Sequence, residues 1–217
     1  MRSAAAAKPA ARGPLRGGPR AVTPSQPGSR PAGPRKAGPA SALALGSGSH
    51  PRLISAGPPA EWRFDGLTVV IGAERAELRY AHEPVGSARP TPDAILEAVA
   101  RARERLAARS RGPDELLPAL AHAYAVVLAR RRGRPGDRVP LVDLRDELAD
   151  GTRAQFAWDI ARLRRERRLV VGGRRLDLGV ATGHATARRS TVVWIEDERG
   201  GGSYFASFRL IAQEVRS

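Results

Sequence analysis

Hydrophobic residues with the spacing of strands or helices begin at about residue 61 and continue almost to the end of the chain. Trp62–Phe64 and Leu67–Ile71 flank Asp65-Gly66. This dipeptide favours a two-residue hairpin turn, because both turn residues need a positive φ. Ala76–Tyr80 alternates apolar and polar positions, which predicts a third strand. The first folded segment therefore begins with a small antiparallel sheet.

A helix is predicted after these strands, from Pro92 to about Arg109. Pro92 fits the first position of a helix, Thr91 can cap it, and Asp93 suits the positive end of the helix dipole. The preceding segment, 81–90, contains two prolines and a glycine and is predicted as a loop. The apolar stripe of the helix consists of Ile95, Leu96, Val99, Ala102 and Leu106.

Two more helices follow the break at Arg111-Gly112-Pro113. The first runs from Asp114 to about Arg132, and it tolerates Pro118 only because this residue lies near its start. The second is short, spans Pro140–Leu148, and carries its leucines on one face. Both helices offer one apolar stripe to a common core.

A longer helix from Thr152 to about Arg168 has two different faces. Thr152 and Gln155 have the spacing of a capping box. The core face holds Phe156, Ile160 and Leu163, and the opposite face holds Trp158, Arg162 and Arg165. Trp158 is expected to pack on the 61–110 segment or under the C-terminal strands, or to stack against a partner.

Two hairpins complete the pattern. Segments 169–171 and 175–178 flank Gly172-Gly173, which is a hairpin turn signal. Thr191–Glu196 and Tyr204–Ile211 are predicted as a last pair of strands, joined through three glycines. The fold class is therefore α+β.

Helix, short helix, tight turn, helix and β-hairpin is the order of a winged helix-turn-helix, and residues 113–178 resemble that superfamily. The turn near Gly151 is a residue or two longer than in the tightest helix-turn-helix motifs. The resemblance implies that the 152–168 helix enters the DNA major groove and that the hairpin touches the adjacent backbone. The implied nucleic-acid contacts are Arg153, Gln155, Arg162, Arg165, Arg174 and Arg175.

Charge divides the 217-residue chain, whose formal net charge is +15. Residues 1–60 carry nine basic side chains, no acidic one, 11 of the 18 prolines and nine of the 23 glycines. Such a segment buries too little apolar surface to fold, so a disordered basic arm is expected; a targeting segment and mistranslated upstream sequence are the alternatives. Residues 61–110 then form a small strand-and-helix unit, and residues 111–217 form the winged-helix-like domain with its C-terminal hairpin.

The folded part, residues 61–217, has 28 basic and 22 acidic side chains and is only mildly basic. Arginine outnumbers lysine 35 to 2, so part of this charge can reflect coding bias, and the arginines after residue 161 can form an ordinary solvated face. Four acids near the short helix also count against DNA, since this helix often crosses the phosphate backbone. They are Asp143, Asp146, Glu147 and Asp150.

Several classes of chemistry are not expected from this sequence. The chain has no cysteine, which excludes disulfides, thiolate metal sites and a cysteine nucleophile. It has no apolar run long enough to span a membrane, no spaced histidine pair and no phosphate-binding Gly-x-x-x-x-Gly-Lys motif. We therefore expect no enzyme activity, no cofactor, no metal site and no membrane partner.

The sequence predicts a cytoplasmic DNA-binding protein of the transcription-regulator type, with either specific or nonspecific binding through the winged helix. The alternative is a non-catalytic interaction module that docks into a larger complex through the winged helix or Trp158.

Overall fold

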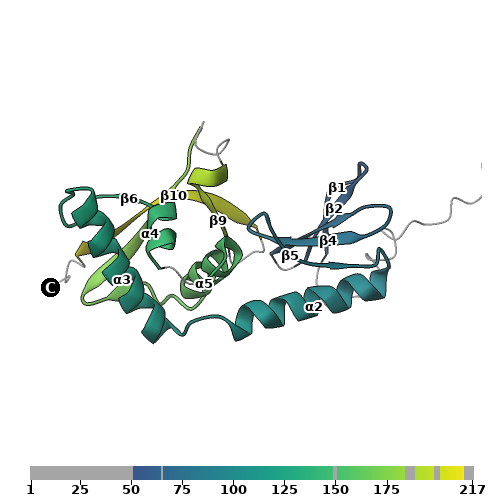
Figure 1. The fold of residues 1–217 in the computed structure, drawn as a ribbon, viewed down its shortest axis with the longest axis horizontal. Coiled ribbons are helices and arrows are strands. Elements are labelled where there is room, and N and C mark those ends of the chain that lie inside the picture. The colour runs from purple at the N-terminus through teal and green to yellow at the C-terminus, as the bar shows by residue number, and fades with distance from the viewer. Residues whose placement is uncertain (1–50, 65, 149–150, 184–188, 198–200, 213–217) are drawn as a thin grey trace, which may run out of the picture. The chain divides into compact units, whose positions relative to one another are not determined.

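Two antiparallel β-sheets and four α-helices make up the described part of the chain (Figure 1). The computed structural model describes residues 51–64, 66–148, 151–183, 189–197 and 201–212. All of these residues belong to one compact unit that spans residues 37–217. The α+β fold class predicted from the sequence is confirmed. None of the described helices is long and apolar enough to cross a membrane.

The first sheet is a five-stranded meander in which each strand pairs with its neighbours along the chain. Its inner face is apolar because alternate residues of the three central strands are buried. The predicted hairpin is present, with Phe64 opposite Leu67 and a positive φ of 85° at Gly66. The strands are β1 (Arg52–Ser55), β2 (Ala60–Phe64), β3 (Leu67–Ile71), β4 (Ala76–Tyr80) and β5 (Glu83–Ala88).

Both edge strands of this sheet differ from the sequence prediction. Among the described residues, the first strand begins at Arg52, inside the segment predicted to be a disordered arm; residues 1–50 of that arm lie outside the described residues. All four residues of β1 are exposed, so no pattern of buried positions marks it. The predicted loop at 81–90 contains β5, which tolerates Pro84 because an edge strand needs hydrogen bonds on one side only.

Helix α2 (Pro92–Ala108) packs against β4 and β5, and it runs along the first sheet in Figure 1. Pro92 occupies the first turn as predicted, and Asp93 is the acidic residue there. The predicted side-chain cap is wrong, because Thr91 holds the N-cap position without a side-chain hydrogen bond. Buried residues on one side of α2 extend the core of the sheet.

The second half contains the predicted order of helix, short helix, helix and hairpin, followed by a 3₁₀ turn, η2 (Arg189–Thr191), and two strands. The C-terminal strand pairs with a two-residue strand between the first helix and the short helix and with the second strand of the hairpin, so the hairpin is one edge of a larger sheet. Membership of the winged-helix superfamily stays a prediction. The elements are α3 (Pro113–Arg130), β6 (Val139–Pro140), α4 (Leu141–Glu147), α5 (Arg153–Arg165), β7 (Val170–Val171), β8 (Arg174–Val180), β9 (Val193–Glu196) and β10 (Gly202–Ala212).

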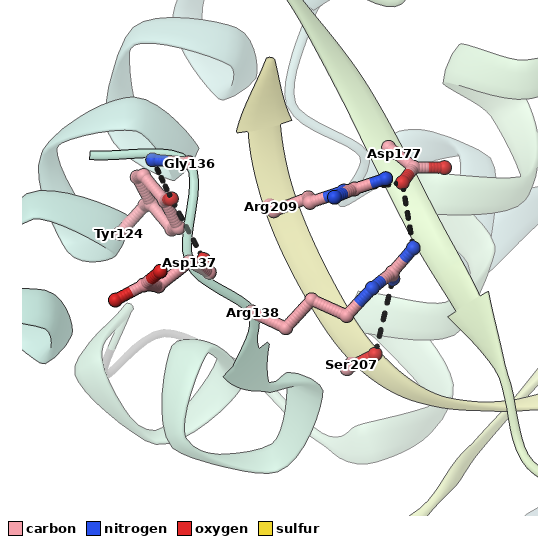
Figure 2. A network of polar contacts seen from close by, with 7 residues as sticks. All are labelled: Tyr124, Gly136, Asp137, Arg138, Asp177, Ser207 and Arg209. Carbon is pink, nitrogen blue, oxygen red and sulfur yellow. Dashed lines mark hydrogen bonds and ion pairs between the residues drawn. The ribbon is translucent and has the colours of Figure 1, made fainter. Parts of the chain in front are cut away.

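A polar network fixes the loop after α3 to this sheet (Figure 2). The Asp177 carboxylate on β8 accepts hydrogen bonds from Arg138 at 2.8 Å and from Arg209 at 2.7 Å. Arg138 also donates to the Ser207 hydroxyl at 3.2 Å, and the Tyr124 hydroxyl donates to the Asp137 carbonyl at 2.8 Å. The loop is thereby connected to α3, β8 and β10.

One apolar core runs through both sheets, from Trp62 on β2 to Leu210 on β10. Tyr80 is fully buried in this core and makes edge-to-face contacts with Trp158 on α5 at 5.4 Å and with Trp194 on β9 at 5.9 Å between ring centroids. The two halves of the chain therefore share a continuous interior.

Candidate functional site

Helix α5, which the sequence predicted to enter a DNA groove, is enclosed along most of its length. Every residue from Ala154 to Ala161 is buried. A helix that reads a major groove needs a free face of side chains. That part of α5 offers none in this arrangement, and the accessible part is its last turn.

The first sheet is what covers the start of α5. The carboxylate of Glu83, the first residue of β5, accepts a hydrogen bond from the backbone N–H of Ala154 at 2.8 Å. Trp158 is only 6% exposed and packs on Tyr80. Of the alternatives left open for Trp158, the structure therefore selects packing within the protein on the 61–110 segment.

Two of the predicted contact residues have structural partners instead of a free surface. Arg153 donates to the Val192 carbonyl at 2.6 Å, and burial lowers the pKa of its guanidinium. Gln155 is 8% exposed, and its amide donates to the Leu106 carbonyl at 3.0 Å. The Thr152 hydroxyl caps the backbone N–H of Gln155 as predicted, while the Gln155 side chain turns away from its expected capping role.

Arg162 and Arg165 lie together at the accessible end of α5. They line a hollow of about 400 Å³ with Trp158, Ala107 and Glu166. The Arg162 Nε donates to Glu166 at 2.7 Å, and the Arg165 guanidinium lies 5.4 Å from the Trp158 ring centroid. Three residues of the predicted polar face thus meet at one surface site.

A second group of arginines, at the end of α2, borders this site and was missed by the sequence analysis. Arg105, Arg109 and Arg111 line a cavity of about 410 Å³ between α2, β5 and the start of α5. Ser110 connects the two groups, since its hydroxyl donates to Asp159 in the cavity at 2.7 Å and accepts from Arg162 at 3.3 Å. A signal existed: residues 101–111 contain five arginines and one acid.

We call these five residues the arginine surface: Arg105, Arg109, Arg111, Arg162 and Arg165. Two of them have a glutamate within ion-pair distance, Arg111 with Glu115 at 3.9 Å and Arg162 with Glu166 at 2.7 Å. Both pairs lie at least partly in solvent, where ion pairs are weak and exchangeable. The surface therefore keeps an excess of positive charge available to an anionic partner.

The predicted wing arginines lie elsewhere. Arg174 and Arg175 are both exposed at the start of β8, after a turn in which Gly172 and Gly173 have φ values of 53° and 70°. Arg174 lines a different groove of about 490 Å³, between α3 and the β7–β8 hairpin. No contact among the described residues joins either side chain to the arginine surface.

Three of the four acids that counted against DNA binding form ion pairs within the protein. Arg130 and Arg131 at the end of α3 pair with Glu147 and Asp143 on α4, each at 2.7 Å. Asp146 pairs with its neighbour Arg145, and Asp150 lies outside the described residues. The acids of α4 that face α3 are thus balanced by arginines of α3.

The described residues contain no group of three or more histidine, aspartate or glutamate side chains that could hold a metal ion. The comparisons with known proteins give no family either: no family model, no curated protein and no solved structure matches this chain.

Proposed function

We propose that this protein binds DNA through contacts between the arginine surface and backbone phosphates. The observation that carries the proposal is the meeting of two arginine groups, from the end of α2 and the end of α5, around Ser110. Guanidinium groups form strong, forked hydrogen bonds with phosphate oxygens. Two such groups side by side favour an extended anion over a single small one.

The burial of α5 determines the kind of binding we expect. With Ala154–Ala161 enclosed, the protein has no free α5 face from which to read base edges. Contacts made through phosphates fix the position of a protein on DNA but carry no sequence information. The proposal is therefore nonspecific binding, and a role in transcription stays a prediction from the resemblance alone.

The test is a titration of the full chain against a fluorescently labelled mixed-sequence duplex at low salt. We expect Arg162→Ala with Arg165→Ala to weaken binding at least tenfold, since two phosphate contacts are lost. The matched control is Arg130→Ala with Arg131→Ala, which removes the same charge from the side that pairs with α4. Equal weakening in both double variants would show that net charge alone attracts DNA and would overturn the assignment.

A second candidate function, docking to another protein, is favoured by the groove between α3 and the β7–β8 hairpin. Its lining is largely apolar and includes Tyr124, Leu128, Val171 and Leu210, and Val170 beside it is 44% exposed. Exposed apolar surface of this kind marks protein contacts. The same titration bears on both candidates, because a chain without DNA affinity at low salt overturns the first and leaves the docking function as the proposal.

A further inference from the structure

We infer that the cavity between α2, β5 and the start of α5 binds a small organic monocarboxylate, with the carboxylate at the arginine rim and an apolar body inside. The cavity holds about 410 Å³, within the range of small-molecule sites. Arg162 and Arg165, the pair chosen to test DNA contact, lie outside its lining. A ligand of this kind can therefore bind whether or not the protein binds DNA.

Apolar residues form part of the cavity wall on two sides. Pro84 and Val85 contribute from β5, and Ala102 and Leu106 contribute from α2. Ala102 and Leu106 are buried, and Val85 packs against the same hydrophobic core. The protein interior thus holds this part of the wall in place, and an apolar ligand body gains free energy when it leaves water for such a wall.

The charged residues of the lining favour an anion with a single charge. Three arginines line the cavity, Arg105, Arg109 and Arg111, against one acidic residue, Asp159. Arg111 also lies 3.9 Å from Glu115, so the inference uses only the other two arginines. The excess of positive charge attracts an anion, while the carboxylate of Asp159 repels a second negative charge. A carboxylate therefore fits the lining better than the doubly charged phosphate of a monoester.

Strand β5 holds Arg105 at the rim of the cavity. The Nη2 of Arg105 donates to the Val85 carbonyl at 2.8 Å, and Gly86 leaves room for it, since a Cβ there would lie 3.2 Å from this nitrogen. The described residues accept this one hydrogen bond from Arg105, so most of its N–H groups remain for a carboxylate. Arg109, one helical turn further along, is exposed and forms no ion pair with the described residues. The rim thus offers two guanidinium groups to an anion.

The experiment is calorimetric titration of the full chain with octanoate and benzoate at low salt. Each is compared with acetate, with the amide of the same apolar body and with the phosphate monoester of that body. We expect octanoate or benzoate to bind at least tenfold more tightly than acetate or the amide, because the apolar body and the charge both contribute. The tighter of the two shows whether the cavity takes a flexible chain or a flat ring.

The role of the rim is tested by Arg105→Ala and Arg109→Ala. Each should weaken carboxylate binding about tenfold, since a charged hydrogen bond to the ligand is lost, and should leave the weaker binding of the amide unchanged. Arg101→Ala, on the same helix and paired with Glu97 at 2.8 Å, is the control for lost charge and should change neither affinity. Equal weakening in all three variants would show attraction by net charge and would overturn the site.

The role of the wall is tested by Val85→Thr, which keeps the shape of the side chain, adds a hydroxyl and retains the carbonyl that holds Arg105. We expect severalfold weaker binding of octanoate or benzoate and no change for acetate. Arg162→Ala with Arg165→Ala should retain carboxylate binding, so failure of the DNA proposal and failure of this inference are distinguishable. Acetate or an amide that binds the unaltered chain as tightly as the carboxylates would overturn the site, and a phosphate monoester that does so would overturn the choice of a monocarboxylate.

Discussion

The Glu83 carboxylate accepts a hydrogen bond from the backbone N–H of Ala154 at 2.8 Å, across 71 residues of sequence. Glu83 belongs to β5 of the first sheet, and Ala154 lies in the first turn of α5. A carboxylate at this position satisfies a helix N–H that has no partner within the helix and interacts favourably with the helix dipole. This bond connects the first sheet to the helix that the winged-helix resemblance places in the DNA major groove.

Replacing Glu83 by Ala should therefore destabilise the protein by about 1–2 kcal/mol, the usual cost of losing a helix cap. The measurement is urea unfolding followed by tryptophan fluorescence, since Trp158 and Trp194 both lie in the shared core. Glu74→Ala is the control, because Glu74 is exposed and makes no contact of this kind. An equal effect of the two substitutions would contradict a capping role for Glu83.

Gly66 is a position where the first sheet and β9 meet closely. A Cβ at this residue would overlap the carboxylate of Glu196, and its φ of 85° also disfavours any other residue. We expect Gly66→Ala to cost about 2–4 kcal/mol, from backbone strain and overpacking together. Gly136→Ala separates the two effects, because Gly136 has a φ of 94° but open space around it, so only the strain remains. Similar losses in thermal unfolding for both variants would contradict the overlap.

The sequence allowed most elements to be predicted, because apolar spacing and turn residues are local signals. Gly172-Gly173 and Thr152 have the predicted turn and cap roles. The strands β1 and β5 could not be predicted, since an exposed or proline-containing edge strand is held by its neighbour's backbone and has no hydrophobic pattern of its own.

The candidate site was predictable only in part, because part of it is assembled by long-range contacts. The spacing placed Trp158, Arg162 and Arg165 on one helix face, and they do meet. What helical spacing could not reveal is which side of that helix stays accessible. The docking of the first sheet covers Gln155 and brings in Arg105, Arg109 and Arg111 from α2, and long-range contacts of this kind have no local signal.

Asp159 should make stability depend on pH. Burial raises the pKa of its carboxyl, and this outweighs the opposing hydrogen bonds from Ser110 and Gln155 and the nearby Arg111 and Arg162. In the unfolded chain the carboxyl titrates near 3.9. The native protein therefore binds the proton more tightly, and stability falls as the pH rises from the unfolded pKa to the native one.

Asp159→Asn replaces the titrating carboxyl by an amide, so the stability of the variant lacks this pH dependence. We expect the free energy of unfolding of the variant, relative to the unaltered chain, to increase from pH 4 upward and to level off once the native carboxyl is ionised. Urea unfolding at a series of pH values between 4 and 8 measures this difference. A difference that shrinks as the pH rises would mean that the charged form is the one stabilised in the folded protein.

The salt dependence of DNA binding separates the arginine surface from the β7–β8 hairpin. Each phosphate contact contributes about −0.9 to the slope of log affinity against log salt, so five contacts predict a slope of about −4.5. Arg162→Ala with Arg165→Ala should make the slope about 1.8 less steep, without loss of thermal stability, because both side chains lie at the accessible end of α5. Arg174→Ala with Arg175→Ala removes the same charge from the hairpin and should leave the slope unchanged. If the hairpin variant alone flattens the slope, DNA lies against the hairpin and the wing prediction from the sequence holds in place of the arginine surface.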